Sequence, residues 1–562
     1  MIIHNKQINI FIEQLVKYSI RDIVISPGSR STPLVNNFLK YKDFFNLDLV
    51  LDERSAAFFA LGKSKVSKRP TVLICTSGTA TLNYSPAIAE SYYSQVPLII
   101  ITSDRPMDYR ETGANQTLNQ NNIYKNNINW FFDIPITDKT NFISNIAYKA
   151  IYNSENSPQG PVHINWQFEE PFTSDEEEKE IKKIEPNEFK KITSEKEMIL
   201  SQDKITNFIN LVKNKKGIIL VGSHNYQNSK ILELSRMINW PIIADPLSNL
   251  RNSKNYFENT IIDTGDILYR SESQNLLPET VIHIGSLPVS KFISKKLENS
   301  KNHIFIDPSN RISHGFYNID LQLHNLDSLI FELDNHKNLF NRKDNNWKNN
   351  FSKIDEKARK SLHENFYKLK EVNFKKIILN NVPDNSFYIS GNSLPIRILD
   401  IILNKSSNIT FLGNRGLSGI DGNISIASGV SSMTDKNVFL DLGDLAFTHD
   451  IGGLITAKRN SKNLTIFLNN NEGGQIFNLL PQSKDLSEIY EDWFITPHQN
   501  LNIKDLCKSL SIDYFNPKNE DELKKIISSN FTNNLNVVEM NFNKKDYLTY
   551  NSLIQKVIDD IN

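Results

Sequence analysis

Short apolar runs that end in Gly, Ser, Asp or Asn recur along the 562-residue chain, with helix-like periodicity between them. Polar and apolar positions do not alternate within these runs, which is typical of strands buried on both faces of a parallel sheet. Their alternation with helical segments predicts βαβ units. The predicted strands form three groups: 22–31, 70–80, 97–106 and 160–168; 217–223, 241–248, 280–288 and 303–310; and 408–416, 437–447, 464–474 and 535–542.

Two polar segments separate the groups. Residues 173–197 carry many charges of both signs, and residues 334–350 are polar and precede a helical pattern that runs to about residue 380. Both are predicted to be linkers or exposed connections. The pattern therefore predicts three doubly wound α/β domains with parallel sheets, at 1–175, 195–345 and 375–562. Ligands are expected beyond the carboxyl ends of the strands.

Composition narrows the class of protein. The chain has 64 Lys and Arg against 64 Asp and Glu, so a nucleic-acid or membrane-surface partner is not indicated. Its two cysteines, Cys75 and Cys507, are too few for a disulfide framework or a thiolate metal site, and a reducing cytoplasm is expected. The first 18 residues suggest an amphipathic helix, and no apolar run approaches the length of a membrane span.

Polar residues follow two predicted strands of the third group. Gly443, Asp444 and Leu445 follow one strand, and the sequence NNNEGG at 469–474 follows the next. Asn471 comes 27 positions after Asp444, which leaves room for one helix and one strand between them. Mg²⁺ prefers oxygen ligands, commonly including phosphate, and glycines allow close backbone approach. Either piece alone is more often simple loop sequence. The pair predicts a metal that bridges the protein to a diphosphate.

The paired motif resembles that of thiamin diphosphate enzymes, GDG followed one βα unit later by NN, with Leu445 in place of the third residue. In this class a glutamate at a helix start in the first domain holds a proton on the cofactor's pyrimidine ring. Glu53 has that setting, between Asp52 and Arg54 and ahead of the apolar run 56–60. Burial against apolar walls would raise the pKa of such a carboxyl. Capping alone would account for Asp52, which is the expected N-cap.

Several segments together resemble the 2-succinyl-5-enolpyruvyl-6-hydroxy-3-cyclohexene-1-carboxylate synthase family. The resemblance covers the first and third groups nearly end to end and is weak in the middle group. It rests on ISPGSRSTPL (25–34), LDERSAAFFALGKSKVSKRP (51–70), TSGTATLNYSPAIAE (76–90), SDRP (103–106), ETGANQT (111–117), GNSLPIRILD (391–400), GNRGLSGIDG (413–422), GDLAFTHDIGGL (443–454) and NNNEGGQIFNLLP (469–481).

The resemblance implies an activity and an assembly. The activity is decarboxylation of 2-oxoglutarate and conjugate addition of the resulting carbanion to isochorismate, in menaquinone or phylloquinone biosynthesis. Thiamin diphosphate and Mg²⁺, or Mn²⁺, are the implied cofactors. Related enzymes seat the cofactor between the first domain of one subunit and the third domain of another, so a homodimer or a dimer of dimers is expected.

The resemblance also assigns residues to the cofactor. Ser77, Gly78 and Thr79 would line its pyrimidine side; a nucleophile elbow is excluded because G-x-S-x-G is absent. The metal would bind Asp444, Asn471 and Gly473. Ile420 would brace the cofactor, although core packing explains apolar positions nearly as well. The full cofactor set is Glu53, Ser77, Gly78, Thr79, Ile420, Gly443, Asp444, Leu445, Asn471, Gly473, Gly474 and Ile476.

Both substrates are dicarboxylates, for which arginines with planar guanidinium groups are suited. The implied substrate residues are Ser29, Arg30, Arg105, Asn115, Gln116, Lys291, Ser393, Arg397, Arg415, Phe477 and Leu480. Ser393, Arg397 and Arg415 would hold carboxylates of the donor or its adduct, and Arg30, Arg105, Asn115, Gln116 and Lys291 would orient isochorismate. Phe477 and Leu480, with Ile476, would supply an apolar wall.

Two departures from the family pattern and two alternatives stay open. Glu472 stands where an uncharged Asn is often found, and Phe292 stands where some relatives have a basic residue. A different thiamin diphosphate enzyme, such as a 2-oxoacid decarboxylase or an acetohydroxyacid synthase-like carboligase, would share Glu53 and Asp444 but would not need the arginine and amide set. A non-catalytic nucleotide-binding protein could use the same sheets. The final quinone, the choice between dimer and tetramer, and any ligand of the middle domain are left undecided.

Overall fold

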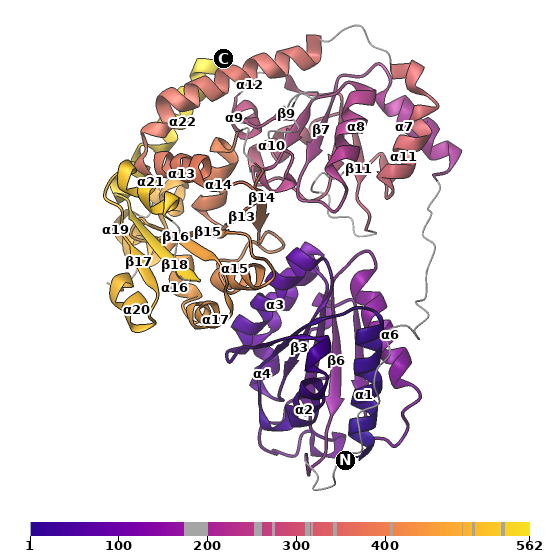
Figure 1. The fold of residues 1–562 in the computed structure, drawn as a ribbon. Coiled ribbons are helices and arrows are strands. Elements are labelled where there is room, and N and C mark those ends of the chain that lie inside the picture. The colour runs from indigo at the N-terminus through magenta and orange to yellow at the C-terminus, as the bar shows by residue number, and fades with distance from the viewer. Residues whose placement is uncertain are drawn as a thin grey trace. The chain divides into compact units, whose positions relative to one another are not determined.

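The computed structural model contains three six-stranded parallel sheets with helices on their faces (Figure 1). It describes residues 2–172, 200–251, 261–271, 276–309, 315, 318–340, 346–404, 408–485, 487–496, 501–529 and 534–562. The predicted linker at 173–197 lies outside these residues, as do positions 341–345 of the predicted connection at 334–350. The described parts of that connection are helical at both ends, in η9 (Lys337–Phe340) and the start of α12 (Asn346–Asn365).

The first sheet has the strand order β2-β1-β3-β4-β6-β5. Its register pairs Ile23 with Val72, and Ile100 with His163. Four of its strands are fully buried, which is why they appear in the sequence as continuous apolar runs. The strands are β1 (Asp22–Ile25), β2 (Asn46–Leu49), β3 (Thr71–Cys75), β4 (Leu98–Asp104), β5 (Trp130–Ile134) and β6 (Pro161–Gln167); the helices are α1 (Ile2–Lys17), α2 (Thr32–Lys40), α3 (Glu53–Ser67), α4 (Thr79–Asn83), α5 (Ser85–Ser94) and α6 (Ile143–Glu155).

The second sheet has the order β12-β11-β10-β7-β8-β9. Strands β7, β8 and β9 form one half of the sheet, and β10, β11 and β12 form the other. The strands are β7 (Gly217–Val221), β8 (Ile242–Ala244), β9 (Ile261–Ile262), β10 (Thr280–Ile284), β11 (Asn302–Ile306) and β12 (Leu321–Leu323); the helices are α7 (Gln202–Val212), α8 (Asn228–Ile238), α9 (Gly265–Arg270), α10 (Lys291–Leu297) and α11 (Leu326–Asp334). Helices α12 and α13 (Lys370–Asn381) lead to the third sheet and confirm the helical pattern predicted to about residue 380.

The third sheet, β14-β13-β15-β16-β18-β17, repeats the topology of the first. In both sheets the strand order reverses beside the first strand, where α/β folds bind ligands. The strands are β13 (Phe387–Ser390), β14 (Thr410–Gly413), β15 (Val438–Gly443), β16 (Leu464–Asn470), β17 (Asp513–Phe515) and β18 (Leu535–Asn541); the helices are α14 (Leu394–Ile402), α15 (Asn423–Ser432), α16 (Asp444–His449), α17 (Gly453–Asn460), α18 (Gln482–Asp485), α19 (Ser487–Tyr490), a π-helical turn (Glu491–Ile495), α20 (Ile503–Ser509), α21 (Glu520–Ser528) and α22 (Tyr550–Ile561).

All twelve predicted strands are present, and the doubly wound parallel α/β class is confirmed. The three sheets fall inside the three predicted domain ranges, whose boundaries stay predictions. Chain contacts define two compact units: unit 1 comprises residues 1–195, 414–435 and 446–464, and unit 2 comprises the remainder. Helices α15 and α17 thus belong with the first sheet.

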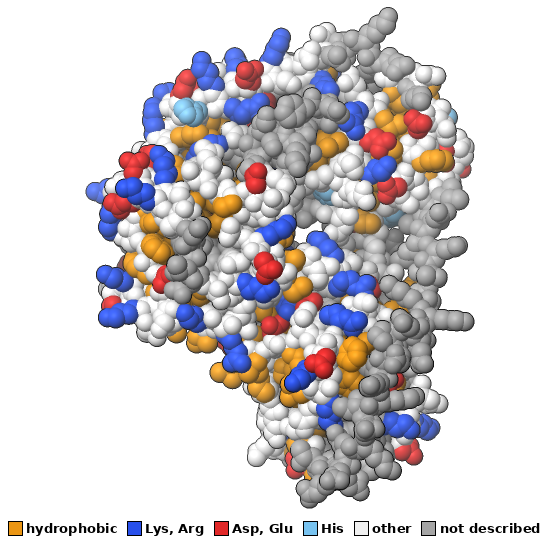
Figure 2. Space-filling view, in the orientation of Figure 1, with side chains coloured by type: hydrophobic (Ala, Val, Ile, Leu, Met, Phe, Trp, Pro, Cys, Tyr) orange, Lys and Arg blue, Asp and Glu red, His pale blue; other side chains and the backbone are white. Residues whose placement is uncertain are grey.

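The visible surface carries Lys and Arg side chains interspersed with Asp and Glu, in keeping with the zero net charge of the sequence (Figure 2). Among the described residues, no helix is both long and apolar enough to cross a bilayer.

Candidate active site

Helix α3 begins with the charged triplet singled out in the sequence. Asp52 is its N-cap, as predicted: its carboxylate accepts the backbone N–H groups of Arg54 and Ser55 at 2.8 and 3.3 Å. Glu53 is the first helical residue and is half-buried within the chain. Arg54 donates to the backbone carbonyl of His449 at 3.1 Å. Asp52 therefore caps the helix and Arg54 binds a backbone carbonyl, whereas the Glu53 carboxyl is not used for capping.

Helix α3 packs closely against α15, with glycines where the two backbones approach. A Cβ at Gly62 would collide with the carbonyl oxygen of Ile426, and one at Gly429 would collide with that of Phe59. At the start of α15, Gly422 has φ +66° and lies against the Phe58 ring. This packing fixes the loop before α15, which contains the predicted residues Arg415 and Ile420, relative to the helix that begins at Glu53.

A second element of unit 1 holds the same loop. Glu90, on α5, is buried, and its two carboxylate oxygens accept the backbone N–H groups of Gly416 and Leu417 at 2.8 and 2.6 Å. Burial raises the pKa of Glu90, while Lys65 opposes that shift. Sequence reasoning missed this role, although Glu90 ends the segment TSGTATLNYSPAIAE; its only signal was an acid among small apolar residues of a helix.

The predicted cofactor and substrate segments of unit 1 meet beyond β3 and β4. Arg105 donates to the Ser77 hydroxyl at 2.7 Å and to the carbonyl of Gln116 at 2.6 Å. The Gln116 amide donates in turn to the Ser77 carbonyl at 3.0 Å. Gly78 has φ +84°, and an added Cβ would lie 2.9 Å from the Gln116 side chain. Thr79 begins α4 directly after this turn.

A second guanidinium lies close to Arg105. Arg30 donates to the Phe168 carbonyl at 2.6 Å and to Glu170 at 3.2 Å. Its pKa is lowered, first by burial and then by the positive charge of Arg105. Glu170 and Asp104 partly offset this positive charge, and neighbouring guanidinium groups are well suited to binding an anionic ligand. Ser29 lies in the same turn after β1. Asn115 is exposed and adjoins Gln116.

In unit 2, the residues predicted to bind the metal come together after β15 and β16. Asp444 is 4% exposed; its Oδ2 accepts the backbone N–H of Gly473 at 2.7 Å, and its Oδ1 accepts that of Leu445 at 2.7 Å. Asn471 is 5% exposed, and its Nδ2 donates to the Tyr547 hydroxyl at 3.0 Å. A carboxylate, a carboxamide and the Gly473 backbone thus adjoin one another.

The backbone around these residues is arranged for close approach. Gly473 has φ +114°, and the exposed Glu472 has φ +64°. A Cβ built on Gly443 meets no atom within 4 Å, so open space lies beside the end of β15. Gly474 is fixed by donating to the Ile495 carbonyl at 2.6 Å. Ile476 and Leu480 are half-buried, Ile476 against the hydrophobic core, and Phe477 is 36% exposed.

The remaining predicted residues of unit 2 lie at the starts of two helices. Ser393 has φ +74° and precedes α14, and Arg397 donates back to its carbonyl at 2.6 Å. Lys291 is exposed and begins α10. Phe292, the departure from the family pattern, is contacted by two cations: Arg270 is 4.1 Å and Lys291 is 5.5 Å from its ring centroid. The Phe292 ring therefore makes a cation–π contact with Arg270, a basic residue of helix α9.

Comparisons with known proteins decide the family. Two family models match: "Thiamine pyrophosphate enzyme, N-terminal TPP binding domain" over residues 6–123 and "Thiamine pyrophosphate enzyme, C-terminal TPP binding domain" over residues 401–539. The chain is similar to three 2-succinyl-5-enolpyruvyl-6-hydroxy-3-cyclohexene-1-carboxylate synthases. That of Bacillus pumilus is 35% identical, over 92% of this chain and 90% of the relative. That of Staphylococcus haemolyticus is 34% identical, over 99% and 98%. That of Listeria innocua is 33% identical, over 95% and 94%.

The chain belongs to this synthase family. It is therefore a thiamin diphosphate enzyme, thiamine pyrophosphate being the same cofactor. A solved benzoylformate decarboxylase from Polynucleobacter necessarius has a similar fold, with a TM-score of 0.71, 15% sequence identity, and coverage of 96% of this chain and 99% of that one. At this identity the likeness supports the fold alone.

The donors beside Asp444 suit the cofactor of the synthase family. The site offers oxygen donors of the kind that Mg²⁺ prefers, with one carboxylate among them. Among the described residues, no cluster of three or more His, Cys, Asp and Glu offers an alternative metal site. The open space beside Gly443 and the backbone turn at Gly473 leave room for a diphosphate against the main chain.

Proposed function

We propose that the chain catalyses the reaction for which its relatives are named: decarboxylation of 2-oxoglutarate and addition of the product carbanion to isochorismate, in menaquinone or phylloquinone biosynthesis. The single observation that carries the proposal is the bridge made by Arg105, whose guanidinium joins Ser77 of the cofactor segment to Gln116 of the substrate segment. A simple decarboxylase of a monoacid has no need of such an arrangement next to the second cation Arg30.

The proposed cofactor half in unit 2 is a metal and diphosphate cradle. The carboxylate of Asp444, the Oδ1 atom of Asn471 and the backbone carbonyl of Gly473 would hold Mg²⁺, or Mn²⁺, against the diphosphate. Thiamin diphosphate, when bound, supplies a carbon nucleophile and an electron sink for the loss of CO₂. Gly443, Leu445 and Gly474 would provide the backbone beside it, and Ile476, Phe477 and Leu480 would exclude water.

The proposed acid–base half in unit 1 is Glu53. Its carboxyl would hold a proton at the pyrimidine ring nitrogen N1′ of the cofactor, with Ser77, Gly78 and Thr79 lining that ring and Ile420 bracing it. Glu53 is half-buried in the single chain, so a neighbouring subunit and the cofactor would complete its burial. A carboxyl enclosed in this way is suited to sharing a proton with the ring nitrogen.

Carboxylate recognition is assigned to the charged and amide residues around the two halves. Ser393, Arg397 and Arg415 would bind carboxylates of 2-oxoglutarate. Ser29, Arg30, Arg105, Asn115, Gln116 and Lys291 would orient isochorismate. The pKa of Arg30 is lowered first by burial and then by the charge of Arg105. A bound carboxylate would reduce the repulsion between the two guanidinium groups, which supports an anionic substrate beside them.

We further propose a homodimer, or a dimer of dimers, in the cytoplasm. Leu51, directly before Asp52, is 81% exposed, and Leu417, after Arg415, is 51% exposed. Each of these large exposed apolar side chains lies two positions from a predicted site residue, Glu53 or Arg415, which supports coverage by a second copy. The free thiols of Cys75 and Cys507 are both buried, which is compatible with a reducing compartment. Light scattering of the purified protein would give the mass of the assembly; a monomer that is fully active would contradict the shared site.

The activity is tested by incubating the protein with 2-oxoglutarate, isochorismate, thiamin diphosphate and Mg²⁺ and identifying the products by mass spectrometry. The expected result is one equivalent each of CO₂ and of the adduct whose mass is the sum of the two substrates less CO₂. If the rate of CO₂ release is unchanged when isochorismate is left out and no adduct forms, the chain is a decarboxylase and the proposal is wrong.

The role of Glu53 is tested by two adjacent substitutions of the same kind. Glu53→Gln keeps the size of the side chain but cannot hold the proton, and we expect a loss of at least about a hundredfold in kcat, the scale of general acid–base catalysis. Asp52→Asn is the matched control, since asparagine also caps helices well, and it should keep near wild-type activity. A Glu53→Gln protein with near wild-type kcat would refute the proton transfer.

A further inference from the structure

Three consecutive asparagines at the end of β16 are each held by a different buried group. Asn469 donates to Asp441 at 2.6 Å, Asn470 donates to Glu539 at 2.6 Å, and Asn471 donates to the Tyr547 hydroxyl at 3.0 Å. The first two contacts anchor the strand end. The third concerns the residue that the proposed function makes a metal ligand.

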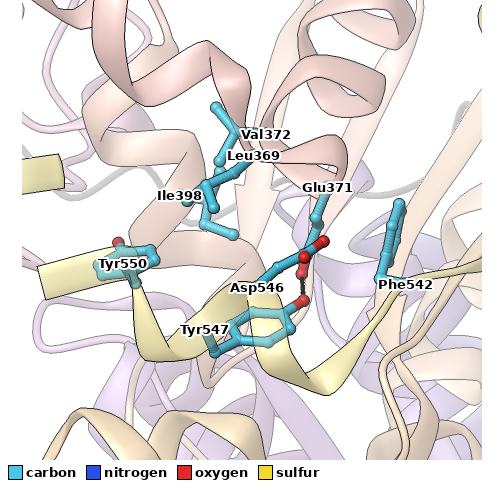
Figure 3. Close-up of a pocket in the computed structure, with 8 residues that line it drawn as sticks. All are labelled: Leu369, Glu371, Val372, Ile398, Phe542, Asp546, Tyr547 and Tyr550. Atoms are coloured by element: carbon cyan, nitrogen blue, oxygen red, sulfur yellow. Dashed lines mark hydrogen bonds between the residues drawn. The ribbon is translucent and has the colours of Figure 1, made fainter. Parts of the chain in front are cut away.

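The partner of Asn471 is itself fixed from behind. The Tyr547 hydroxyl donates to Oε2 of Glu371, and Figure 3 shows the two side chains pointing toward each other. Glu371 is 3% exposed and lies on α13. Its other oxygen lies 3.5 Å from the Lys375 ammonium, which also pairs with Asp441 at 2.8 Å. The contacts from Asn471 through Tyr547 to Glu371 are therefore buried, and the Asn471 side chain also interacts directly with Glu371.

The two hydrogen bonds that link Asn471, Tyr547 and Glu371 run in the same direction. A tyrosine hydroxyl has one proton to donate, and here Oε2 of Glu371 receives it. The hydroxyl oxygen therefore faces Asn471 as an acceptor, and the Asn471 carboxamide must present its nitrogen to Tyr547. The opposite end of that amide, Oδ1, is turned away from Tyr547. A carboxamide without such a partner can turn over and present its nitrogen, which cannot bind a cation.

We propose that Tyr547, oriented by Glu371, is a positioning residue that fixes the Asn471 amide with its oxygen toward the metal. The inference rests on the proposed function, in which Asn471 Oδ1 is a metal ligand. It adds two residues from outside the cofactor motif, on α13 and on the turn Lys544–Leu548, as determinants of metal binding. Groups that orient metal ligands typically contribute ten- to a hundredfold in metal affinity.

The space around Tyr547 makes a conservative test possible. Leu369, Val372, Ile398 and Phe542 line the small cavity beside it, so a phenylalanine ring keeps its packing (Figure 3). Tyr547→Phe removes only the hydroxyl. Tyr550 lines the same cavity and stands apart from the Glu371 and Tyr547 pair in Figure 3, so Tyr550→Phe is the matched control.

The experiment measures the Kd of Mg²⁺ and of Ca²⁺ by calorimetric titration of the full-length protein with saturating thiamin diphosphate. We expect Tyr547→Phe to raise the Kd of Mg²⁺ about tenfold or more and that of Ca²⁺ much less, because Mg²⁺ demands near-ideal octahedral geometry and Ca²⁺ does not. Tyr550→Phe should leave both values unchanged. Equal weakening of both ions would indicate general loosening and would overturn the positioning role.

Further variants separate failure of the inference from failure of the proposed function. If Asn471→Ala binds Mg²⁺ as wild type does, the proposed metal site itself is wrong. If Asn471→Ala weakens binding and Tyr547→Phe does not, only the inference is wrong. In an Asn471→Asp background no amide remains to be oriented, so Tyr547→Phe should have no further effect; a full additional loss there would also contradict the inference.

A second variant covers the case in which Tyr547→Phe does not fold. Glu371→Leu leaves the tyrosine in place but removes the acceptor of its proton, so the hydroxyl is free to donate to Asn471 Oδ1 and turn the amide over. The same selective loss of Mg²⁺ affinity is expected. Unchanged affinity for both ions in Glu371→Leu would overturn the inference.

Discussion

Glu90 Oε1 accepts the backbone N–H of Gly416 at 2.8 Å, which fastens the loop that carries Arg415 to helix α5 of the first sheet. The second carboxylate oxygen accepts Leu417 N–H at 2.6 Å, and a Cβ at Gly416 would lie 2.8 Å from the Glu90 carbonyl oxygen. The loop therefore depends on one buried carboxylate and on the absence of a side chain at residue 416. The substrate contact proposed for Arg415 would therefore depend on packing inside unit 1.

Glu90→Gln is expected to loosen this loop. The glutamine amide nitrogen would face one of the two backbone N–H groups. One buried hydrogen bond would be lost and two buried donors would be left without an acceptor, at a cost of about 1–3 kcal/mol. The KM for 2-oxoglutarate should rise about tenfold, and trypsin should cut after Arg415 faster than in the wild type. Glu298→Gln, at an exposed carboxylate of unit 2, is the control. Unchanged cleavage and KM would show that Glu90 does not hold the loop.

Gly429→Ala is expected to destabilise unit 1. Its Cβ would collide with the Phe59 carbonyl, and backbone atoms cannot yield as a flexible side chain can, so α15 would have to move away from α3. Overpacking of this kind costs about 1–3 kcal/mol or more, and the apparent melting temperature should fall by several degrees. Gly452→Ala is the control: the residue has helical φ and ψ, and its Cβ would lie 3.5 Å from the nearest atom, Asp52 Oδ2. Equal melting temperatures would mean that the helices tolerate separation.

Arg105→Lys is expected to weaken substrate binding more than cofactor binding. One guanidinium nitrogen bridges the Ser77 hydroxyl and the Gln116 carbonyl, which leaves the rest of the planar group for a carboxylate, and a lysine ammonium cannot do both in this geometry. The KM for isochorismate should rise about tenfold, while the Kd of thiamin diphosphate stays within about twofold. Arg459→Lys, at an exposed position of α17, is the control. A cofactor Kd that rises as much as KM would place Arg105 at the cofactor instead.

The sequence predicted the buried strands because they are continuous apolar runs, and it missed six others for a physical reason. Five of these, β2, β5, β9, β12 and β17, lie at sheet edges, where short or partly exposed strands need no such run. The sixth, β13, is an inner strand of only four residues, FYIS. The equivalent topology of the first and third sheets was also invisible, because strand order depends on tertiary pairing.

Candidate residues that belong to a local sequence motif were found. Residues whose roles depend on contacts between distant segments of the chain were missed. Asp444 and Asn471 follow predicted strands, and ligands of parallel α/β sheets bind beyond the carboxyl ends of the strands, so both residues could be located from the sequence. Glu90, Glu371 and Tyr547 act through contacts that span 326, 176 and 76 positions in sequence: Glu90 to Gly416, Glu371 to Tyr547 and Tyr547 to Asn471. Nothing in their local sequence distinguishes them from ordinary helical or loop residues.

Asp450 provides a test of pH dependence. It is fully buried and accepts the backbone N–H of Ser425 at 2.8 Å and the Ser425 hydroxyl at 3.2 Å. Burial raises the pKa of its carboxyl from 3.8 to about 6, against the opposing effects of the Ser425 and Ile424 contacts and the charge of Arg54. Between these two pH values the native protein binds more protons at this site than the unfolded chain, so this group lowers the free energy of unfolding as pH rises.

Asp450→Asn removes this proton linkage while keeping an oxygen to accept the Ser425 N–H. The variant should therefore gain stability relative to the wild type as pH rises from 4.5 to 7.5, by about 2 kcal/mol of the roughly 3 kcal/mol that a shift of about two pKa units is worth in full. The difference in melting temperature between variant and wild type, measured by intrinsic fluorescence at both pH values, should become more positive at pH 7.5. Asp435→Asn, at a 93% exposed side chain, should show no such trend. A difference that is constant with pH, or that grows more negative, would mean that the Asp450 carboxyl ionises in the native protein as readily as in the unfolded chain.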